Sequence, residues 1–233
     1  MVAIDYEARR GQLEEYFDRT ASKAWAALTS NEPVGRIRAT VRAGRERMQQ
    51  TLLGYLPEDL SGLRVLDGGC GTGTFSVALA QRGAHVIAVD ISKTLVDLAR
   101  ERTARDAGPG TMEFHVGDML DASLGTFDWV VALDSLIHYP ADQLQSLLVQ
   151  LCARTRVGVA FTFVPRTPLL SLLNAVGKTF PRGNRSPDIR PITERSLRAR
   201  LAADPAMAQY TSARSDRVES GFYTSQAMEL LRR

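Results

Sequence analysis

Short apolar runs alternate with amphipathic stretches along most of the chain, and this pattern predicts strands separated by helices. The expected strands are residues 63–69, 84–90, 112–118, 127–134 and 156–165. The expected helices between them are residues 74–83, 92–105 and 141–152. Helices of about ten to fifteen residues between strands are typical of a parallel, doubly wound sheet. The sequence therefore predicts an α/β fold.

Helical segments precede and follow this alternation. Residues 5–54 are expected to be helical, and Ser92 and Thr193 are expected to cap later helices. After the fifth strand come an apolar helix (167–180), a loop rich in proline and arginine, and a helix at 193–204. The remaining residues supply two last strands, which gives seven, mostly parallel. We therefore expect an N-terminal helical cover at 1–57 and a main domain at 58–233 with a helical, substrate-side insertion at about 166–205.

The amino-acid composition is that of an ordinary globular protein. The 233 residues are 44% hydrophobic and 24% charged, which is typical of a globular protein. Cys70 and Cys152 have no metal-ligand spacing and cannot build a disulfide framework, which favours a reducing compartment. No apolar run approaches the roughly 20 residues of a membrane span, and the N-terminus has no signal core. The predicted localisation is cytoplasmic.

The net charge of +3 is too small to indicate a nucleic-acid partner. Aromatic residues make up only 7% of the chain and are not clustered, so an RNA-binding enzyme is disfavoured. Arginines gather at 35–47 and 181–190. These stretches are either solvated faces or the holders of an anionic substrate.

The stretch LDGGCGTGTF (66–75) places a glycine-rich turn between the first strand and its helix. Glycine allows a sharp turn and a close approach of the backbone to a ligand. The spacing does not fit the NAD fingerprint Gly-x-Gly-x-x-Gly/Ala. Counted from Gly69 or Gly71, Thr74 or Ser76 stands where the last glycine or alanine belongs. The glycine-rich turn contains no Gly-Lys-Ser/Thr either, so it is not a P-loop.

Three acids follow the next strands. Asp90 ends the second strand, where a carboxylate can accept the ribose hydroxyls of a nucleoside. Asp118 ends the third, where it can meet an adenine amino group. Asp134 ends the fourth and either faces the reaction centre or caps its own turn.

This set resembles the class I S-adenosylmethionine-dependent methyltransferases. The resemblance implies a Rossmann-like sheet, S-adenosyl-L-methionine as cofactor and S-adenosyl-L-homocysteine as product. In that family the glycine loop holds the methionine end, and the acids hold the ribose and the adenine. The implied cofactor contacts are Asp67, Gly69, Cys70, Gly71, Gly73, Asp90, Ile91, Asp118, Met119 and Asp134.

Flanking segments narrow the resemblance to the magnesium-protoporphyrin IX methyltransferases of chlorophyll and bacteriochlorophyll biosynthesis. The segments are YFDRTASKAW (16–25), MQQTLLGYL (48–56), LDSLIHYP (133–140) and FVPRTPLL (163–170). Ala24 and Ala26–Ala27 depart from the family pattern around Trp25. That family serves photosynthesis by methylating a porphyrin propionate, so magnesium enters only as part of the substrate and no protein metal site is expected. The family also implies the porphyrin-binding subunit of magnesium chelatase as donor, and a peripheral contact with the photosynthetic membrane stays open.

A propionate changes what the site needs. A carboxyl group has a reference pKa of about 4, so the nucleophile is already ionised and needs no base. His138 is therefore expected to orient or bind the porphyrin, and the resemblance makes His138 and Tyr16 the catalytic candidates. The expected substrate contacts are Tyr139, Arg38, Arg42, Leu169 and Leu173. The alternatives are a methyltransferase for a phenol or quinone with His138 as a true base, and a silent cofactor-binding module.

Overall fold

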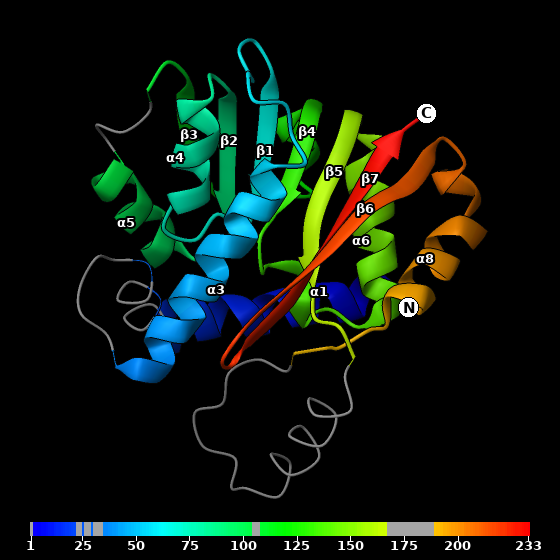
Figure 1. Ribbon diagram of the computed structural model, residues 1–233, viewed down its shortest axis with the longest axis horizontal. Coiled ribbons are helices and arrows are strands. Elements are labelled where there is room, and N and C mark those ends of the chain that lie inside the picture. The colour runs from blue at the N-terminus through cyan, green and yellow to red at the C-terminus, as the bar shows by residue number, and fades with distance from the viewer. Residues whose placement is uncertain (1, 22–24, 26–28, 30–34, 104–107, 167–188) are drawn as a thin grey trace, which may run out of the picture.

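The computed structural model describes residues 2–21, 25, 29, 35–103, 108–166 and 189–233. Its strands form one sheet in the order β3-β2-β1-β4-β5-β7-β6 (Figure 1). The first five pair in parallel, whereas β7 pairs antiparallel with β5 and β6 antiparallel with β7. The predicted seven-stranded, mostly parallel sheet is confirmed. The strands are β1 (Arg64–Gly68), β2 (His85–Asp90), β3 (Thr111–Val116), β4 (Phe127–Ala132), β5 (Thr155–Phe163), β6 (Tyr210–Ser220) and β7 (Tyr223–Arg232).

The helices follow the predicted pattern where the structure describes them. Ser92 and Thr193 cap α5 and α8: each hydroxyl accepts a backbone N–H three residues later, at 3.3 and 3.2 Å. The apolar helix expected at 167–180 lies outside the described residues. The helices are α1 (Val2–Glu15), the π-helical turn η1 (Tyr16–Ala21), α3 (Arg36–Leu53), α4 (Thr74–Gln81), α5 (Lys93–Thr103), α6 (Ala141–Ala153) and α8 (Glu194–Ala203); the 3₁₀ turns are η2 (Ala122–Leu124), η3 (Leu136–His138) and η4 (Pro205–Met207).

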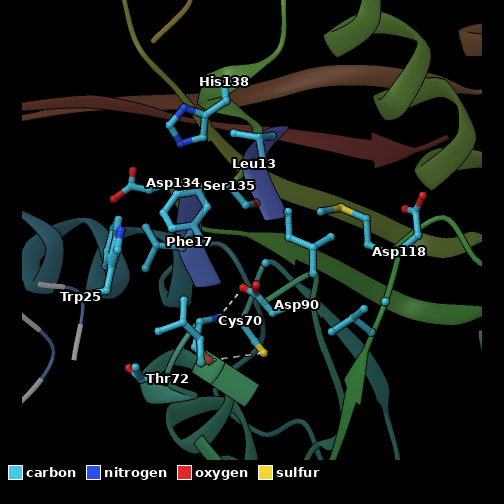
Figure 2. A pocket seen from close by; sticks show the side chains of 18 of the residues that line it. Leu13, Phe17, Trp25, Cys70, Thr72, Asp90, Asp118, Asp134, Ser135 and His138 are labelled. Carbon is cyan, nitrogen blue, oxygen red and sulfur yellow. Dashed lines mark hydrogen bonds between the residues drawn. The ribbon is translucent and has the colours of Figure 1, made fainter. Parts of the chain in front are cut away.

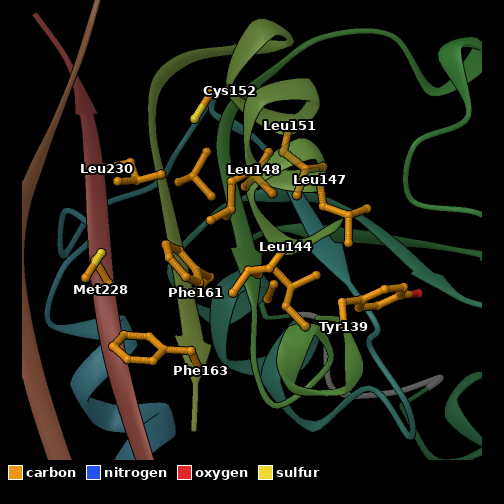
Figure 3. Packing of buried hydrophobic residues seen from close by; sticks show 14 of the residues in the cluster. Tyr139, Leu144, Leu147, Leu148, Leu151, Cys152, Phe161, Phe163, Met228 and Leu230 are labelled. Carbon is orange, nitrogen blue, oxygen red and sulfur yellow. The ribbon is translucent and has the colours of Figure 1, made fainter. Parts of the chain in front are cut away.

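Two apolar cores cover the two faces of the sheet, because successive side chains of a strand point to opposite faces. In β5, Phe161 and Phe163 join the core formed with α6, while Ala160 faces the core formed with α3 and α4. Figure 3 shows the first core, in which Leu144 and Leu148 of α6 pack towards the β5 side chains. Burial on both faces explains why the central strands read as near-continuous apolar runs.

Helix α3 lies very close to the antiparallel end of the sheet. A Cβ at Gly44 would lie 2.5 Å from the Tyr223 ring, so only glycine permits this approach. The contact places this face of α3 against the Tyr223 ring of β7. Helix α1 runs along the edge where the parallel strands end (Figure 1), and its Leu13 is buried in the α6 core. Helical segments from residues 1–57 therefore reach the edge at which α/β sheets bind ligands; the division into a cover and a main domain stays a prediction.

Candidate active site

A cavity opens at the carboxyl edge of β1, β2 and β4, and helical residues from the N-terminal segment close its other side. Figure 2 shows Asp90 in its middle, with Asp118 towards one end and Asp134 and Trp25 towards the other. His138 lies on the wall above them. The predicted acids at the ends of consecutive strands thus meet in one cavity.

The glycine loop has the geometry that the sequence predicts. Gly69, Gly71 and Gly73 have φ of 80°, 55° and 78°, in the left-handed region that favours glycine. A Cβ at Gly69 would lie 2.2 Å from the Cβ of Ser135, which shows how closely the two loops approach. Gly69, Cys70 and Gly71 line the cavity, whereas Gly73 begins α4 and packs against Phe114.

Asp90 holds the loop and faces the cavity. Its carboxylate accepts backbone N–H bonds from Gly71 at 2.8 Å and from Ser92 at 2.9 Å. Burial raises the pKa of Asp90, and the two N–H donors act in the opposite direction. A carboxylate has about four acceptor positions. Asp90 therefore retains acceptor capacity for a ribose while it shapes the loop.

Asp67 lies beneath the loop and is not among the residues that line the cavity. The Ser76 hydroxyl donates to its carboxylate at 2.6 Å, and the side chain is 1% exposed. Burial, with the nearby Asp90 charge, raises the pKa of Asp67 to about 7. A direct contact between Asp67 and the methionine end stays a prediction, while its hydrogen bond ties β1 to α4.

The raised pKa of Asp67 predicts a pH-dependent stability. Between about pH 4 and about pH 7 the folded protein holds a proton on Asp67 that the unfolded chain has lost, so stability falls as the pH rises. Urea unfolding across this window should show that the decline is reduced in Asp67→Asn, which resembles the protonated acid. Asp142→Asn, an exposed acid on α6, should keep the wild-type decline. An Asp67→Asn protein with the same pH dependence as the wild type would contradict the assignment.

Asp118 also lines the cavity, and helix α1 holds its carboxylate. The Tyr6 hydroxyl donates to one oxygen at 2.9 Å and the Arg10 guanidinium to the other at 2.8 Å. Ile91 and Met119, the expected neighbours of the adenine, lie in the same cavity wall. No sequence signal marks Tyr6 or Arg10, because only the path of α1 across the sheet edge brings them to Asp118.

Asp134 is held inside a cage of donors from other elements. The hydroxyls of Tyr223, Ser225 and Thr162 donate to its carboxylate at 3.0–3.2 Å. Its backbone N–H donates to Thr162 at 2.7 Å, and its φ of 55° is unusual for a residue other than glycine. The side chain lines the cavity, and its donors come from β5 and β7 instead of from its own turn.

His138 lies in η3, 5% exposed, with its ring packed edge-on against Phe17 at 5.8 Å. Tyr139 follows it and stacks with Tyr6 at 5.7 Å between ring centroids. Burial, with the nearby Asp118, raises the pKa of Tyr139 to about 12, so its hydroxyl stays protonated at neutral pH. Both residues line the cavity, and the N-terminal aromatics that cover them do so as well.

Other predicted residues lie elsewhere. Tyr16 packs against Phe17, and among the described side chains it is not part of the cavity wall. Arg38 is exposed on α3 and Arg42 half-buried, and neither lines the cavity. Leu169 and Leu173 lie outside the described residues. The roles proposed for all five stay predictions.

Arg45, one helical turn beyond Arg42, is the arginine of α3 that reaches the cavity. Its guanidinium lies 4.4 Å from the centroid of the Trp25 ring and 3.5 Å from the Asp134 carboxylate. Sequence spacing places several arginines on this helix and cannot choose among them. Arg45 directly follows Gly44, the residue of α3 that approaches the Tyr223 ring.

The cavity residues fit an adenosylmethionine cofactor. The glycine loop leaves space beside Asp90, and the Oγ1 atom of Thr72 is buried in the cavity wall without a hydrogen-bond partner in the described structure. Among the residues that the structure describes, no group of three His, Cys, Asp or Glu side chains is placed to hold a metal ion. No described helix is long and apolar enough to cross a membrane.

The strand order, the glycine loop after β1 and the acids after β2 and β3 define a class I S-adenosylmethionine-dependent methyltransferase. A general methyltransferase-domain model matches residues 65–158, and a model of the magnesium-protoporphyrin IX methyltransferase C-terminus matches residues 132–232. The magnesium-protoporphyrin O-methyltransferase of Rhodobacter capsulatus is 47% identical over 226 residues, which cover 97% of each chain. The chain belongs to this family of magnesium-protoporphyrin methyltransferases.

Solved structures agree with this assignment. The crystal structure of magnesium protoporphyrin IX methyltransferase from Synechocystis PCC 6803 with bound SAH has a TM-score of 0.83. It shares 27% identity, and the match covers 96% of this chain and 99% of that one. A ubiquinone biosynthesis O-methyltransferase from Xanthomonas oryzae is 33% identical over 134 residues, but this match covers only 54% of the chain. The match to the porphyrin methyltransferases therefore includes the N-terminal and C-terminal segments, which the shorter match cannot cover in full.

Proposed function

We propose that the protein transfers the methyl group of S-adenosyl-L-methionine to a propionate carboxylate of magnesium protoporphyrin IX. The product is the monomethyl ester, an intermediate of chlorophyll and bacteriochlorophyll biosynthesis. The observation that carries the proposal is the near full-length, 47% identity to a magnesium-protoporphyrin O-methyltransferase. The cavity supports it, because its glycine loop and acids fit the cofactor.

The chain's own residues would hold the cofactor along the sheet edge. Asp90 would accept the ribose hydroxyls, Asp118 and Met119 would lie beside the adenine, and the glycine loop would face the methionine end. When bound, the cofactor supplies an electrophilic methyl group on a sulfonium, and S-adenosyl-L-homocysteine is the product. Tyr6 and Arg10 orient the carboxylate of Asp118 from above.

The acceptor needs alignment more than activation. A propionate is ionised at neutral pH, and ester formation from a carboxylate releases no proton. The site therefore has to exclude water and align the carboxylate in line with the methyl group. Phe17, Trp25 and Tyr139 supply apolar rings to the cavity wall, and His138 stands among them as a positioning hydrogen-bonding group.

The pH dependence separates this proposal from a phenol or quinone methyltransferase. With saturating cofactor, the rate on magnesium protoporphyrin should vary by less than about twofold between about pH 6 and pH 8, well above the carboxyl pKa. An enzyme that deprotonates a phenol should lose rate as its base becomes protonated. A steep loss of porphyrin methylation towards pH 6 would favour a general base in the site.

The substrate side and the partners form the finer part of the proposal. Tyr16, Tyr139, Arg38, Arg42, Leu169 and Leu173 are proposed to contact the porphyrin. Direct delivery by the porphyrin-binding subunit of magnesium chelatase is supported by family membership and by the low solubility of a broad apolar disc. A peripheral membrane contact is supported by the exposed apolar side chains of Ile37 and Phe222. Their segments lie close together, because Thr40 of α3 packs against Gly221 in the turn between β6 and β7.

A further inference from the structure

Arg45 is the one lysine or arginine among the described residues that line the cavity. Its side chain is only 17% exposed, although it carries a full positive charge. The guanidinium carbon lies 4.4 Å from the centroid of the Trp25 ring, a cation–π contact that uses none of the N–H donors in the guanidinium plane. A buried cation at this position requires an anionic partner.

Asp134 provides only part of that partner. The shortest distance between the two charged groups is 3.5 Å, whereas charge-assisted N–H···O bonds are about 2.7–2.9 Å. Asp134 already accepts bonds from Tyr223, Ser225 and Thr162. The Nη1 atom of Arg45 is buried and makes no hydrogen bond with the described residues. The guanidinium therefore has donor capacity that Asp134 does not use.

Thr72 is a second, independent donor in the same wall. It lies in the glycine loop, it is 4% exposed, and its Oγ1 atom has no hydrogen-bond partner among the described residues. Leaving a buried hydroxyl or guanidinium without an acceptor is costly. Figure 2 shows Thr72, Trp25 and Asp134 on the side of Asp90 that is away from Asp118. Arg45, which contacts Trp25 and Asp134, and Thr72 thus both lie in the part of the cavity away from Asp118.

We propose that Arg45 and Thr72 form a carboxylate-binding subsite at the Asp134 end of the cavity. The guanidinium supplies N–H donors and charge, and the Thr72 hydroxyl supplies a further donor to the same ligand group. Asp134 limits the net charge of the subsite and holds the guanidinium edge in place. The inference rests on the proposed function, which provides two carboxylates: that of the cofactor's amino-acid end and the propionate of the porphyrin.

The test compares ligands with and without each carboxylate in wild-type protein, Arg45→Gln and Thr72→Val. Calorimetry measures S-adenosylhomocysteine against its decarboxylated analogue, and magnesium protoporphyrin against its dimethyl ester. Arg200→Gln, an exposed arginine on α8, is the matched control. Loss of a charge-assisted bond should weaken binding by roughly tenfold or more for Arg45→Gln and by less for Thr72→Val. Arg45→Lys should restore part of the affinity.

A selective loss for S-adenosylhomocysteine, with its decarboxylated analogue unchanged, assigns the subsite to the cofactor. A selective loss for magnesium protoporphyrin, with its dimethyl ester unchanged, assigns it to the substrate. Unchanged affinity for all four ligands overturns the proposal. Equal losses for each ligand and its blocked analogue also overturn it, because they report only a damaged cavity. The cofactor pair keeps its meaning even when the wild-type protein fails to methylate the porphyrin, so failure of the proposed function is seen separately.

Discussion

Replacing Asp90 by asparagine is expected to weaken S-adenosylhomocysteine binding by at least roughly tenfold. The carboxylate accepts two backbone N–H bonds that shape the glycine loop, and it is the proposed acceptor for the ribose. An asparagine has one oxygen and no charge, so it can keep only part of these bonds. Buried hydrogen bonds to a charged group contribute about 1.5–3 kcal/mol, which corresponds to about one to two powers of ten in affinity.

Calorimetric titration checks this result against Asp97→Asn on the neighbouring helix α5. Asp97 is exposed and pairs only with residues of its own helix in the described structure, namely Lys93 and Arg100, so its loss should change affinity by less than about twofold. Thermal unfolding of both variants establishes that they are folded. An Asp90→Asn protein that is folded and binds S-adenosylhomocysteine as tightly as the wild type would contradict the site.

Replacing His138 by phenylalanine is expected to lower kcat/KM on magnesium protoporphyrin by at least roughly tenfold, with cofactor affinity nearly unchanged. Phenylalanine keeps a ring that can pack against Phe17, but it removes both ring nitrogens. The substrate would lose a hydrogen bond that helps to hold its carboxylate in line with the methyl group. Asp90 and Asp118, the proposed cofactor contacts, lie on other strand ends and do not depend on this ring.

The matched variant is His115→Gln, because His115 is exposed on β3 and its ring lies 3.7 Å from Glu113. It should retain full turnover and full cofactor affinity. If His138→Phe also retains full turnover, the histidine is a packing residue of η3 and has no part in positioning the porphyrin. If it loses cofactor affinity as strongly as turnover, the assignment of His138 to the substrate side is wrong.

The sequence allows much of the fold to be predicted because its signals are local. Buried parallel strands give apolar runs, and the hydroxyls of Ser92 and Thr193 mark the starts of α5 and α8. The alternation of strand and helix predicts a parallel, doubly wound sheet, but it does not specify the order of the strands. The antiparallel end with β7 inserted between β5 and β6 depends on the whole sheet, and the expectation of two last strands did not specify it.

The cavity was predictable where its residues come from strand ends. Asp90, Asp118, Asp134 and His138 each follow an apolar run, so their position in the fold is set by local sequence. Tyr6, Arg10 and Arg45 could not be chosen in this way, because their placement depends on how two helices cross the sheet. Arg45 follows Gly44, whose close approach to Tyr223 is a tertiary contact. No sequence motif marks that contact.

Mass spectrometry of the product is the sharpest check on methyl transfer to a porphyrin carboxylate. The purified protein is incubated with S-adenosyl-L-methionine and magnesium protoporphyrin IX, with the porphyrin dimethyl ester as the blocked substrate. We expect one added methyl group per porphyrin, carried as a propionate ester, and none on the dimethyl ester. A porphyrin that stays unmodified while a phenol or quinone is methylated by the same protein would contradict it.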